Sequence, residues 1–342
     1  LGMRQDWRAA GRLTARARSS QVEIEGRART SDGLEGGAGG SRLVYCATGS
    51  RQRGDGATNS GMRTSQVHSA RARARHTLAR RLRTAALTAS ALLSALIGTT
   101  RSVLAQSGPE YGPSKGTLLI VGGGQLDGSG IYEKFIELAG GPSAKIVVVP
   151  TAGGNKRGDG TPIVYHADTV LASWRKMGLT NVHMLHTHDP AVANTPAFAE
   201  MLRDARAVWF VGGRQWNIVD SYANTLTFKA FHDVLARGGV IGGSSAGATI
   251  QGEYLVRGAI AGAQIMMAPE PEHQQAFGFL RRSAIDQHIN TRNRWNDLQQ
   301  VIGKFPNLLG IGISEATAIV VRGDQFEVMG KAQVAIHDST HP

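Results

Sequence analysis

One serine of this chain lies in a pattern that can make a hydroxyl group a nucleophile. Residues 243–247 read Gly-Ser-Ser-Ala-Gly, and the short apolar run 239–241 leads into them. In a strand–turn–helix unit, a G-x-S-x-G sequence holds its middle residue in a strained turn at the carboxyl end of a sheet. That residue is Ser245. The alternative is an ordinary glycine-serine turn, and residues elsewhere in the chain must distinguish the two.

A serine hydroxyl needs a general base, a group that orients this base, and donors for the developing oxyanion. Of the 11 histidines, His288 is the first candidate, because it ends the short apolar run 284–288 directly after Asp286 and Gln287. A strand that ends in polar groups places them where open α/β sheets keep their sites. The rival base is His337, because an α/β-hydrolase esterase usually carries its histidine late in the chain.

Backbone donors for an oxyanion can come from glycines at the end of a strand. Gly212 and Gly213 follow the apolar run 207–211. The N–H of Gly213 and the N–H of Ala246, which directly follows the serine, are therefore the predicted pair. A plain turn between strand and helix is the alternative interpretation of the two glycines.

Two further clusters do not predict a cofactor or a metal. Residues 122–124 are three glycines after an apolar run, but Asp127 stands where the dinucleotide-binding pattern needs its third glycine. Three histidines between residues 183 and 188 have a single carboxylate beside them, so no metal site is expected there.

The elements that must position these residues follow an alternating pattern. Apolar runs that predict buried strands occur at 117–122, 145–150, 182–185, 207–211 and 239–241. Helical patterns lie between them, at 131–139, 161–177, 195–204 and 225–237. This alternation predicts an α/β fold with a doubly wound, mainly parallel sheet and helices on both faces.

The C-terminal part has a different pattern. After the run that ends at His288, residues 289–294 are expected to open a helical stretch. Short strands separated by turns then follow, at 308–313, 318–322, 325–329 and 333–337. They predict a strand-hairpin extension of the same sheet.

The N-terminal third differs in composition from the rest. Residues 1–61 are rich in Gly, Arg and Ser and are expected to be disordered or to reflect a misassigned start, with Met62 as the true one. Residues 62–105 combine a basic segment, the apolar run 85–97 and small residues near a cleavage site, which predicts a signal peptide. Residues 106–342 would then be a single secreted or periplasmic hydrolase domain, without membrane association after cleavage. An uncleaved anchor is the alternative, and the choice between the general and the twin-arginine export route stays open.

The net charge of +12 does not indicate a nucleic-acid partner. Residues 1–106 hold 18 Arg and 6 acidic residues, whereas the remainder holds 20 basic and 20 acidic residues. Only Trp7 and Tyr45 are aromatic in the basic part, too few for a surface that stacks bases. The only cysteine, Cys46, also lies there, so disulfides and cysteine catalysis are excluded from the predicted domain.

Several motifs, taken in order, resemble a known family. From about residue 116 to 338 the chain is similar to the peptidase family of cyanophycinases and aspartyl dipeptidases (peptidase family S51), and more to the cyanophycinase branch. The matching segments are 122–124, 150–152, 212–215, 242–248, 286–288 with the arginines that follow, and 310–318. The resemblance implies a fold like that of class I glutamine amidotransferases and a Ser–His–acid site.

The resemblance also implies roles for individual residues. Ser245 would be the nucleophile and His288 the base, with Gly213 and Ala246 as oxyanion donors. The implied substrate contacts are Gln215, Asp286, Arg292 and Arg294. The substrate would be cyanophycin, a polyaspartate with arginine on each β-carboxyl group, or a β-aspartyl peptide. Arginines suit its free carboxylates, and Asp286 suits its guanidinium groups. No cofactor is implied, and a homodimer is possible.

Two departures from the family pattern stand out. Arg214 occupies a position where the family often has an acidic residue. The orienting acid is expected after the serine, yet residues 258–267 contain no carboxylate. Of Glu253, Glu270 and Glu272, the last is the predicted acid. An aspartyl dipeptidase, an esterase that uses the rival histidine, and a non-catalytic secreted relative remain as alternatives.

Overall fold

The computed structural model describes residues 3–6, 14–16 and 110–339. The predicted signal peptide and the single cysteine lie outside the described residues, as does most of the segment 1–61. Among the residues described, no helix is long and apolar enough to cross a membrane.

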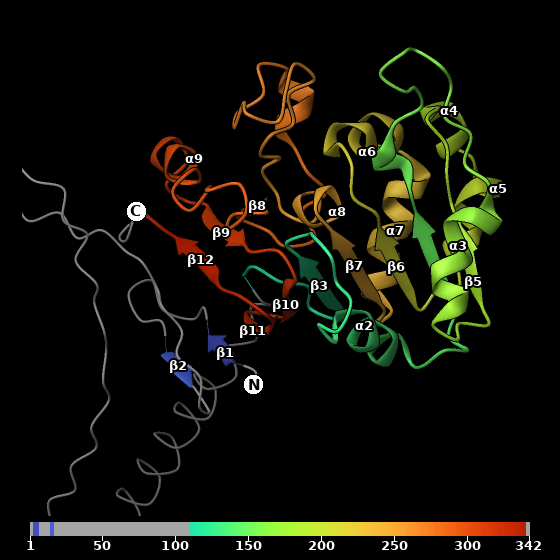
Figure 1. Cartoon of the computed structure of the whole chain (residues 1–342), viewed down its shortest axis with the longest axis horizontal. Helices are drawn as coiled ribbons and strands as arrows, with labels where there is room; N and C mark the ends of the chain where they lie inside the picture. The colour runs from blue at the N-terminus through green and yellow to red at the C-terminus, as the bar shows by residue number, and fades with distance from the viewer. Residues whose placement is uncertain (1–2, 7–13, 17–109, 340–342) are drawn as a thin grey trace, which may run out of the picture. The chain divides into compact units, whose positions relative to one another are not determined.

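The main sheet confirms the predicted parallel core. Its central strands run parallel in the order β3-β7-β6-β4-β5 (Figure 1). They are β3 (Thr117–Val121), β4 (Ile146–Val149), β5 (Val182–Met184), β6 (Ala207–Phe210) and β7 (Val240–Ser244). Nearly all their residues are buried, as expected for a sheet that helices cover on both faces.

Antiparallel strands extend this sheet beyond β3. β10 (Thr317–Arg322) pairs with β3, and β11 (Gln325–Gly330) pairs with β10. The N-terminal strands β1 (Met3–Asp6) and β2 (Thr14–Arg16) continue the order beyond β11. The predicted hairpin at the C-terminal end of the chain is thus present as β10 and β11.

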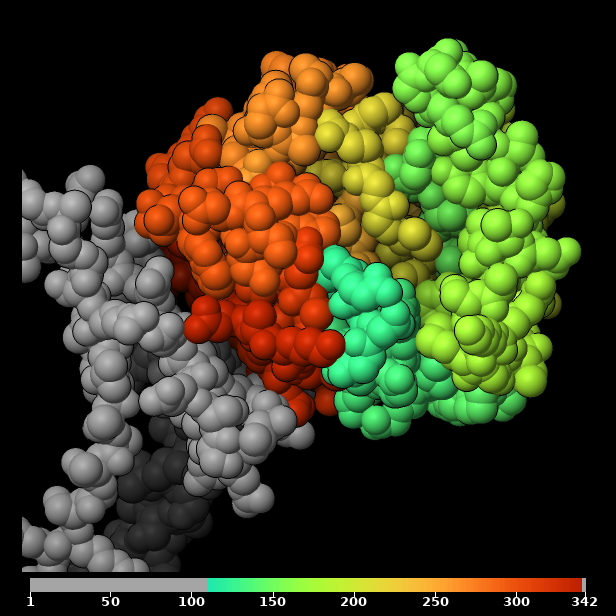
Figure 2. All heavy atoms as spheres, in the orientation of Figure 1, coloured from blue at the N-terminus to red at the C-terminus, as the bar shows by residue number. Residues whose placement is uncertain are grey.

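A separate three-stranded sheet holds the other C-terminal strands, which the sequence assigns to the main sheet. It has the order β12-β9-β8, formed by β8 (Ser283–Gln287), β9 (Leu309–Ile313) and β12 (Val334–His337). Two backbone hydrogen bonds join the sheets, from His288 N–H to Gly122 O and from Ala316 N–H to Gly123 O, both 2.9 Å. In Figure 2 the segment after β3, in turquoise, accordingly lies beside the orange and red C-terminal part.

Helices cover both faces of the main sheet. On one face, α2 (Ile131–Ala139) and α3 (Ala167–Lys176) pack Phe135 and Trp174 against Trp209. On the other, Tyr222 and Phe231 pack into the core cluster with Phe210. The helices that contribute to this second cluster are α4 (Pro190–Ala193), α6 (Gln215–Tyr222), α7 (Leu226–Ala236) and α8 (Ala246–Thr249).

Short helices complete the fold. These are η1 (Thr151–Gly153), α5 (Pro196–Ala199), η2 (Glu200–Leu202), η3 (Pro271–Gln274) and α9 (Gln299–Lys304). The helix expected at 195–204 is split into α5 and η2, and the helical stretch expected directly after His288 is a series of turns.

The predicted start of helix α3, at residue 161, is wrong. Asp159 accepts hydrogen bonds from the backbone N–H and the hydroxyl of Thr161, and Lys156 forms a β-bridge with Pro162. These contacts hold residues 155–165 as a loop, and α3 begins only at Ala167. A side-chain hydrogen bond to a residue two positions away competes with helix formation in this way.

Candidate active site

Ser245 lies in a sharp turn between β7 and α8. Its φ of 58° and ψ of −116° are unfavourable for a residue with a Cβ atom, as in a nucleophile elbow. Its N–H donates to Val121 O at 3.0 Å, which fixes the turn against the end of β3. Strain of this kind is stored at functional sites when the surrounding structure holds it in place.

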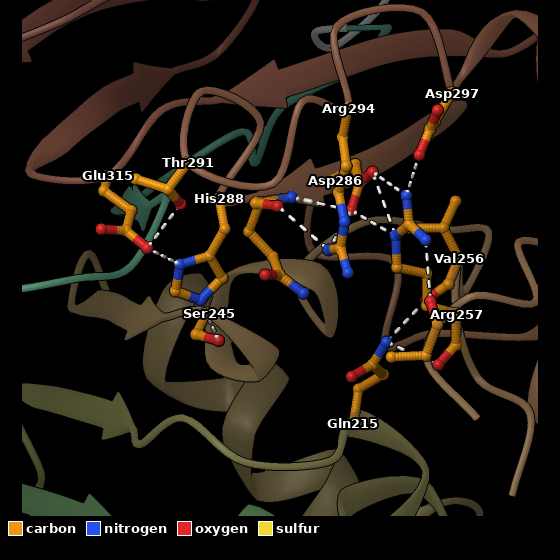
Figure 3. A network of polar contacts seen from close by, with 12 residues as sticks. Gln215, Ser245, Val256, Arg257, Asp286, His288, Thr291, Arg294, Asp297 and Glu315 are labelled. Carbon is orange, nitrogen blue, oxygen red and sulfur yellow. Dashed lines mark hydrogen bonds and ion pairs between the residues drawn. The ribbon is translucent and has the colours of Figure 1, made fainter.

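The side chain of Ser245 is hydrogen-bonded to His288. Ser245 Oγ lies 2.8 Å from His288 Nε2, and His288 Nδ1 lies 2.5 Å from Glu315 Oε1 (Figure 3). Thr291 also donates its hydroxyl proton to Glu315 Oε1, at 2.8 Å. Ser245, His288 and Glu315 thus form one continuous chain of hydrogen bonds from hydroxyl to imidazole to carboxylate.

The small sheet brings His288 and Glu315 together. β8 and β9 are parallel, and Gln287 pairs with Ile313, so the residues after each strand emerge at the same edge. Asn290 Oδ1 accepts a hydrogen bond from the N–H of Glu315 at 2.9 Å. This bond joins the turn after β8 to the turn after β9. His288 and Ala316 both have left-handed backbone conformations, with φ of 57° and 52°.

Gly123 allows the histidine ring to approach the main sheet. A Cβ atom at this position would lie 2.3 Å from His288 Cε1 and 2.6 Å from His288 Nε2. The φ of Gly123 is +104°, a conformation that other residues rarely adopt. The glycine run that superficially suggests dinucleotide binding therefore makes room for the imidazole.

The electrostatics of the site favour a neutral imidazole beside an ionised carboxylate. Burial lowers the pKa of His288, and the charges of Arg292 and Arg294 lower it further against the opposing effect of Glu315. Although desolvation raises the pKa of Glu315, hydrogen bonds from His288 and Thr291 bring it below its usual value. With Glu315 ionised, His288 Nδ1 carries the proton, and Nε2 is free to accept one from Ser245.

The segments that hold the predicted oxyanion donors border the serine. A Cβ atom at Gly212 would be 3.2 Å from Ser245 Cβ, so the glycine pair after β6 borders the hydroxyl. Gly213 packs so closely on Ala152 O that a Cβ atom there would be 2.2 Å from it. Ala246 is the first residue of α8, where a backbone N–H has no acceptor within the helix.

The structure places a different carboxylate beside His288 from the one that the sequence predicts. Glu272 is exposed on η3, whereas the carboxylate bonded to His288 is that of Glu315. The sequence does contain a signal for Glu315, because it follows a predicted strand just as His288 does. The family resemblance places the acid in the stretch after the serine, whereas Glu315 follows a later strand.

Two of the predicted substrate contacts are engaged elsewhere. Asp286 is fully buried and forms a bidentate ion pair with Arg257, so it is not open to a substrate guanidinium. Gln215 is 3% exposed, and its amide group donates to the carbonyl oxygens of Val256 and Arg257 at 2.7 and 2.8 Å. Both side chains therefore bind residues of the protein itself, Val256 and Arg257, next to the site.

The two predicted arginines differ in their environment. Arg292 is exposed and close enough to His288 to influence its pKa. The side chain of Arg294 is 10% exposed and donates to Gln287 O at 3.3 Å. In Figure 3 the Arg294 guanidinium lies between the Ser245–His288 pair and Arg257. These two cations are the groups that could receive a carboxylate near the serine.

The rival base does not contact the serine. His337 is 4% exposed at the end of β12, and a hydrogen bond with the backbone of Trp295 engages it. Within residues 110–339 and the two short N-terminal segments, no three His, Cys, Asp or Glu side chains converge on a point where they could hold a metal.

Comparisons with known proteins assign the chain to a peptidase family. The model of a family described as peptidase family S51 matches residues 118–329. Cyanophycinase from Geminocystis herdmanii (strain PCC 6308) is 28% identical over 228 residues, which span 66% of this chain and 81% of the relative. Cyanophycinase from Synechococcus elongatus is 29% identical over 236 residues, 67% of this chain and 70% of the relative. The crystal structure of a peptidase from an acI-B1 Actinobacterium is 22% identical, with a TM-score of 0.49, and the match covers 66% of this chain and 91% of that one. The chain belongs to peptidase family S51, in its cyanophycinase branch, and is a serine-type peptidase.

Proposed function

We propose that this protein hydrolyses the amide links of β-aspartyl peptides or of a cyanophycin-like Asp/Arg polymer through an acyl-enzyme. The observation that carries the proposal is the hydrogen-bond chain from Ser245 through His288 to Glu315, with distances of 2.8 and 2.5 Å. Such an arrangement activates a serine hydroxyl on folds that are otherwise unrelated.

In the first half of the reaction, Ser245 Oγ attacks the carbonyl carbon of the scissile amide. His288 Nε2 takes the hydroxyl proton as the new C–O bond forms, and Glu315 stabilises the imidazolium through Nδ1–H. The negative charge on the former carbonyl oxygen would be received by the N–H groups of Gly213 and Ala246. His288 then gives its proton to the leaving nitrogen, and the C–N bond breaks.

In the second half, a water molecule attacks the ester carbon of the acyl-enzyme. His288 Nε2 takes a proton from this water, and the second tetrahedral intermediate faces the same N–H groups. The bond to Ser245 Oγ breaks, and the protonated His288 returns a proton to the serine oxygen. The products are an amine and a carboxylic acid, which loses its proton to solvent, and the triad regains its starting protonation.

The preference for an acidic peptide rests on charge. Arg292 and Arg294 lie near His288, and guanidinium groups bind carboxylates with charge-assisted hydrogen bonds. Two relatives of this chain are named cyanophycinases, which supports a substrate that contains aspartate. The site offers no role in substrate binding to Asp286, because Arg257 already occupies its carboxylate.

The test is incubation of the purified protein with cyanophycin and with a panel of α- and β-aspartyl dipeptides, followed by mass spectrometry of the products. The proposal expects dipeptides or free amino acids from at least one member of the panel, and no product with the Ser245→Ala variant. Failure to cleave any aspartyl amide, or equal cleavage by Ser245→Ala, would refute it.

We also propose that the protein is exported, on the evidence of the basic segment and the apolar run before residue 106. Expression of the full chain in a bacterial host, followed by N-terminal sequencing of the protein outside the cytoplasm, tests this. A mature N-terminus near Gln106 is expected, and an uncleaved chain that stays in the membrane fraction would contradict it.

A further inference from the structure

A buried ion pair joins Arg257 to Asp286, which lies in β8 two residues before His288. Arg257 is 2% exposed and Asp286 is fully buried. Arg257 Nε donates to both carboxylate oxygens of Asp286, at 2.9 and 3.1 Å, and Nη2 donates to Oδ2 at 2.8 Å. Asp286 also accepts the N–H of Gln287 at 2.9 Å, so its carboxylate is fully hydrogen-bonded.

Arg257 also joins the segments that surround this pair. Its Nη2 donates to Asp297, and its Nη1 donates to Ala263 O at 2.7 Å. Its backbone carbonyl accepts the amide of Gln215, which begins α6. The φ of Arg257 is 56°, so the backbone is held in a left-handed conformation that costs free energy in a residue with a side chain. These contacts fix the direction of its guanidinium group.

A second cation, Arg294, lies beside the same carboxylate without pairing closely with it. Arg294 Nη1 is 3.6 Å from Asp286 Oδ1, beyond hydrogen-bond distance, and it donates instead to Gln287 O at 3.3 Å. Within the described part of the chain, its guanidinium makes no other hydrogen bond. Because Arg257 saturates Asp286, the other N–H groups of Arg294, whose side chain is 10% exposed, have no acceptor among the described residues and lie on the side of Ser245 and His288 (Figure 3).

Removal of Arg257 would change this arrangement. A buried carboxylate without a partner is strongly unfavourable, so Asp286 would attract the nearest remaining cation. Arg294 needs to move by less than about 1 Å to form a normal charge-assisted hydrogen bond with Asp286. The Arg294 guanidinium would then be paired with Asp286 and would no longer be free to bind a substrate carboxylate.

We propose that Arg257 is a positioning residue for substrate binding: by saturating Asp286, it keeps the Arg294 guanidinium free to bind a carboxylate of the substrate. The inference rests on the proposed function, because it assigns the site an acidic peptide. It makes Asp286 a group whose charge must be neutralised rather than a ligand for the substrate. The ion pair of Arg257 with Asp286 thus leaves Arg294 without a close carboxylate partner.

The test is steady-state kinetics of Arg257→Gln, of Arg257→Gln with Asp286→Asn, and of Arg294→Gln, on the cleaved aspartyl peptide. Arg257→Gln and Arg294→Gln are each expected to raise KM about 10- to 100-fold, since each loses one charge-assisted contact, while kcat changes less than about threefold. The double variant is expected to return KM to within about threefold of wild type, because a neutral amide at position 286 no longer attracts Arg294.

A second substrate separates positioning from stability. On the same peptide with its free carboxylate converted to an amide, wild type and Arg257→Gln should have equal KM values, because Arg294 then has no charge to bind. Where Arg257→Gln does not fold, Arg257→Lys keeps the buried charge but not the bidentate contact, and KM should rise by a smaller factor. Thermal unfolding of each variant shows which ones are folded.

Two results would overturn the inference: an unchanged KM in the folded Arg257 variants, or a double variant that is no better than Arg257→Gln. Neither result affects the proposed function, which fails if no aspartyl amide is cleaved or if Ser245→Ala cleaves as well as wild type. Loss of kcat alone in Arg257→Gln, with KM unchanged, would assign Arg257 to the fold and also contradict the positioning role.

Discussion

The imidazole of His288 lies against the backbone of Gly123, at a distance that leaves no room for a side chain. A Cβ atom there would be 2.3 Å from Cε1 of the ring. We expect Gly123→Ala to displace His288 from Ser245 and to lower kcat/KM about 100-fold or more, because small displacements of a catalytic group have effects of this size. Steady-state kinetics on the cleaved peptide measure the loss.

Gly128→Ala is the matched control for this variant. Gly128 also has a positive φ, of +66°, but a Cβ atom there would meet nothing within 4 Å. It carries the same kind of backbone strain without the contact to His288, so its activity should stay within about threefold of wild type. Equal losses in both variants would show that backbone strain, not the ring contact, is responsible.

The identity of the orienting acid can be tested with one pair of variants. Glu315→Gln should lower kcat about 10³- to 10⁴-fold, because an amide beside Nδ1 neither fixes the right tautomer nor stabilises the imidazolium. Glu272→Gln should have wild-type kinetics, because Glu272 is exposed on η3. The reverse pattern would restore the assignment that the sequence predicts.

The pH dependence of catalysis should report the environment of His288. Burial and the neighbouring arginines lower its pKa, so the acid limb of kcat/KM should have its midpoint below pH 6.5. Activity is lost as pH falls through this midpoint, because protonated His288 cannot accept the serine proton. A midpoint above pH 6.5 in a profile of the free enzyme would contradict this environment.

Arg292 gives this profile a specific test. Its positive charge contributes to the lowering of the His288 pKa, so Arg292→Gln should move the acid limb to higher pH. Any effect on substrate binding appears in KM, whereas the shift of the midpoint reports the charge. Raised ionic strength should shift the wild-type midpoint in the same direction, because the side chain is exposed and its charge is screened. An unmoved midpoint would show that the charge does not act on His288.

A second histidine should make stability depend on pH. Burial, with a contribution from His188, lowers the pKa of His186 to about 4. The unfolded chain therefore binds more protons between pH 6.5 and about 4, and the free energy of unfolding should decrease as pH falls through this range. Urea unfolding at several pH values should show a weaker dependence in His186→Asn than in wild type. His166→Asn, at an exposed position, should leave the dependence unchanged.

The parallel sheet could be predicted because its strands are continuous apolar runs. Thr117–Val121 and Val240–Ser244 lie almost where the runs place them, and α2 begins and ends at the predicted residues. Local hydrogen bonds from polar side chains are not encoded in such runs. The loop that Asp159 and Tyr165 hold ahead of α3, through Thr161 and Gly154 O, therefore differs from the predicted helix.

The pairing of Ser245 with His288 could be predicted because each follows an apolar run at the carboxyl edge of a sheet. The rest of the site depends on partners that only the folded chain reveals. Asp286 has the sequence context of a substrate ligand, but a residue 29 positions away neutralises it. Glu315 lies directly after the parallel neighbour of β8, and strand pairing is not readable from the spacing of apolar residues.

Ser245 is the proposed nucleophile of an amide hydrolase. The most direct measurement is kcat/KM of Ser245→Ala on the cleaved aspartyl peptide, beside Ser244→Ala as a matched control in the same turn. We expect a loss of about 10⁴-fold or more for Ser245→Ala, near wild-type activity for Ser244→Ala, and unchanged thermal unfolding for both. Turnover by Ser245→Ala at the wild-type rate would contradict it.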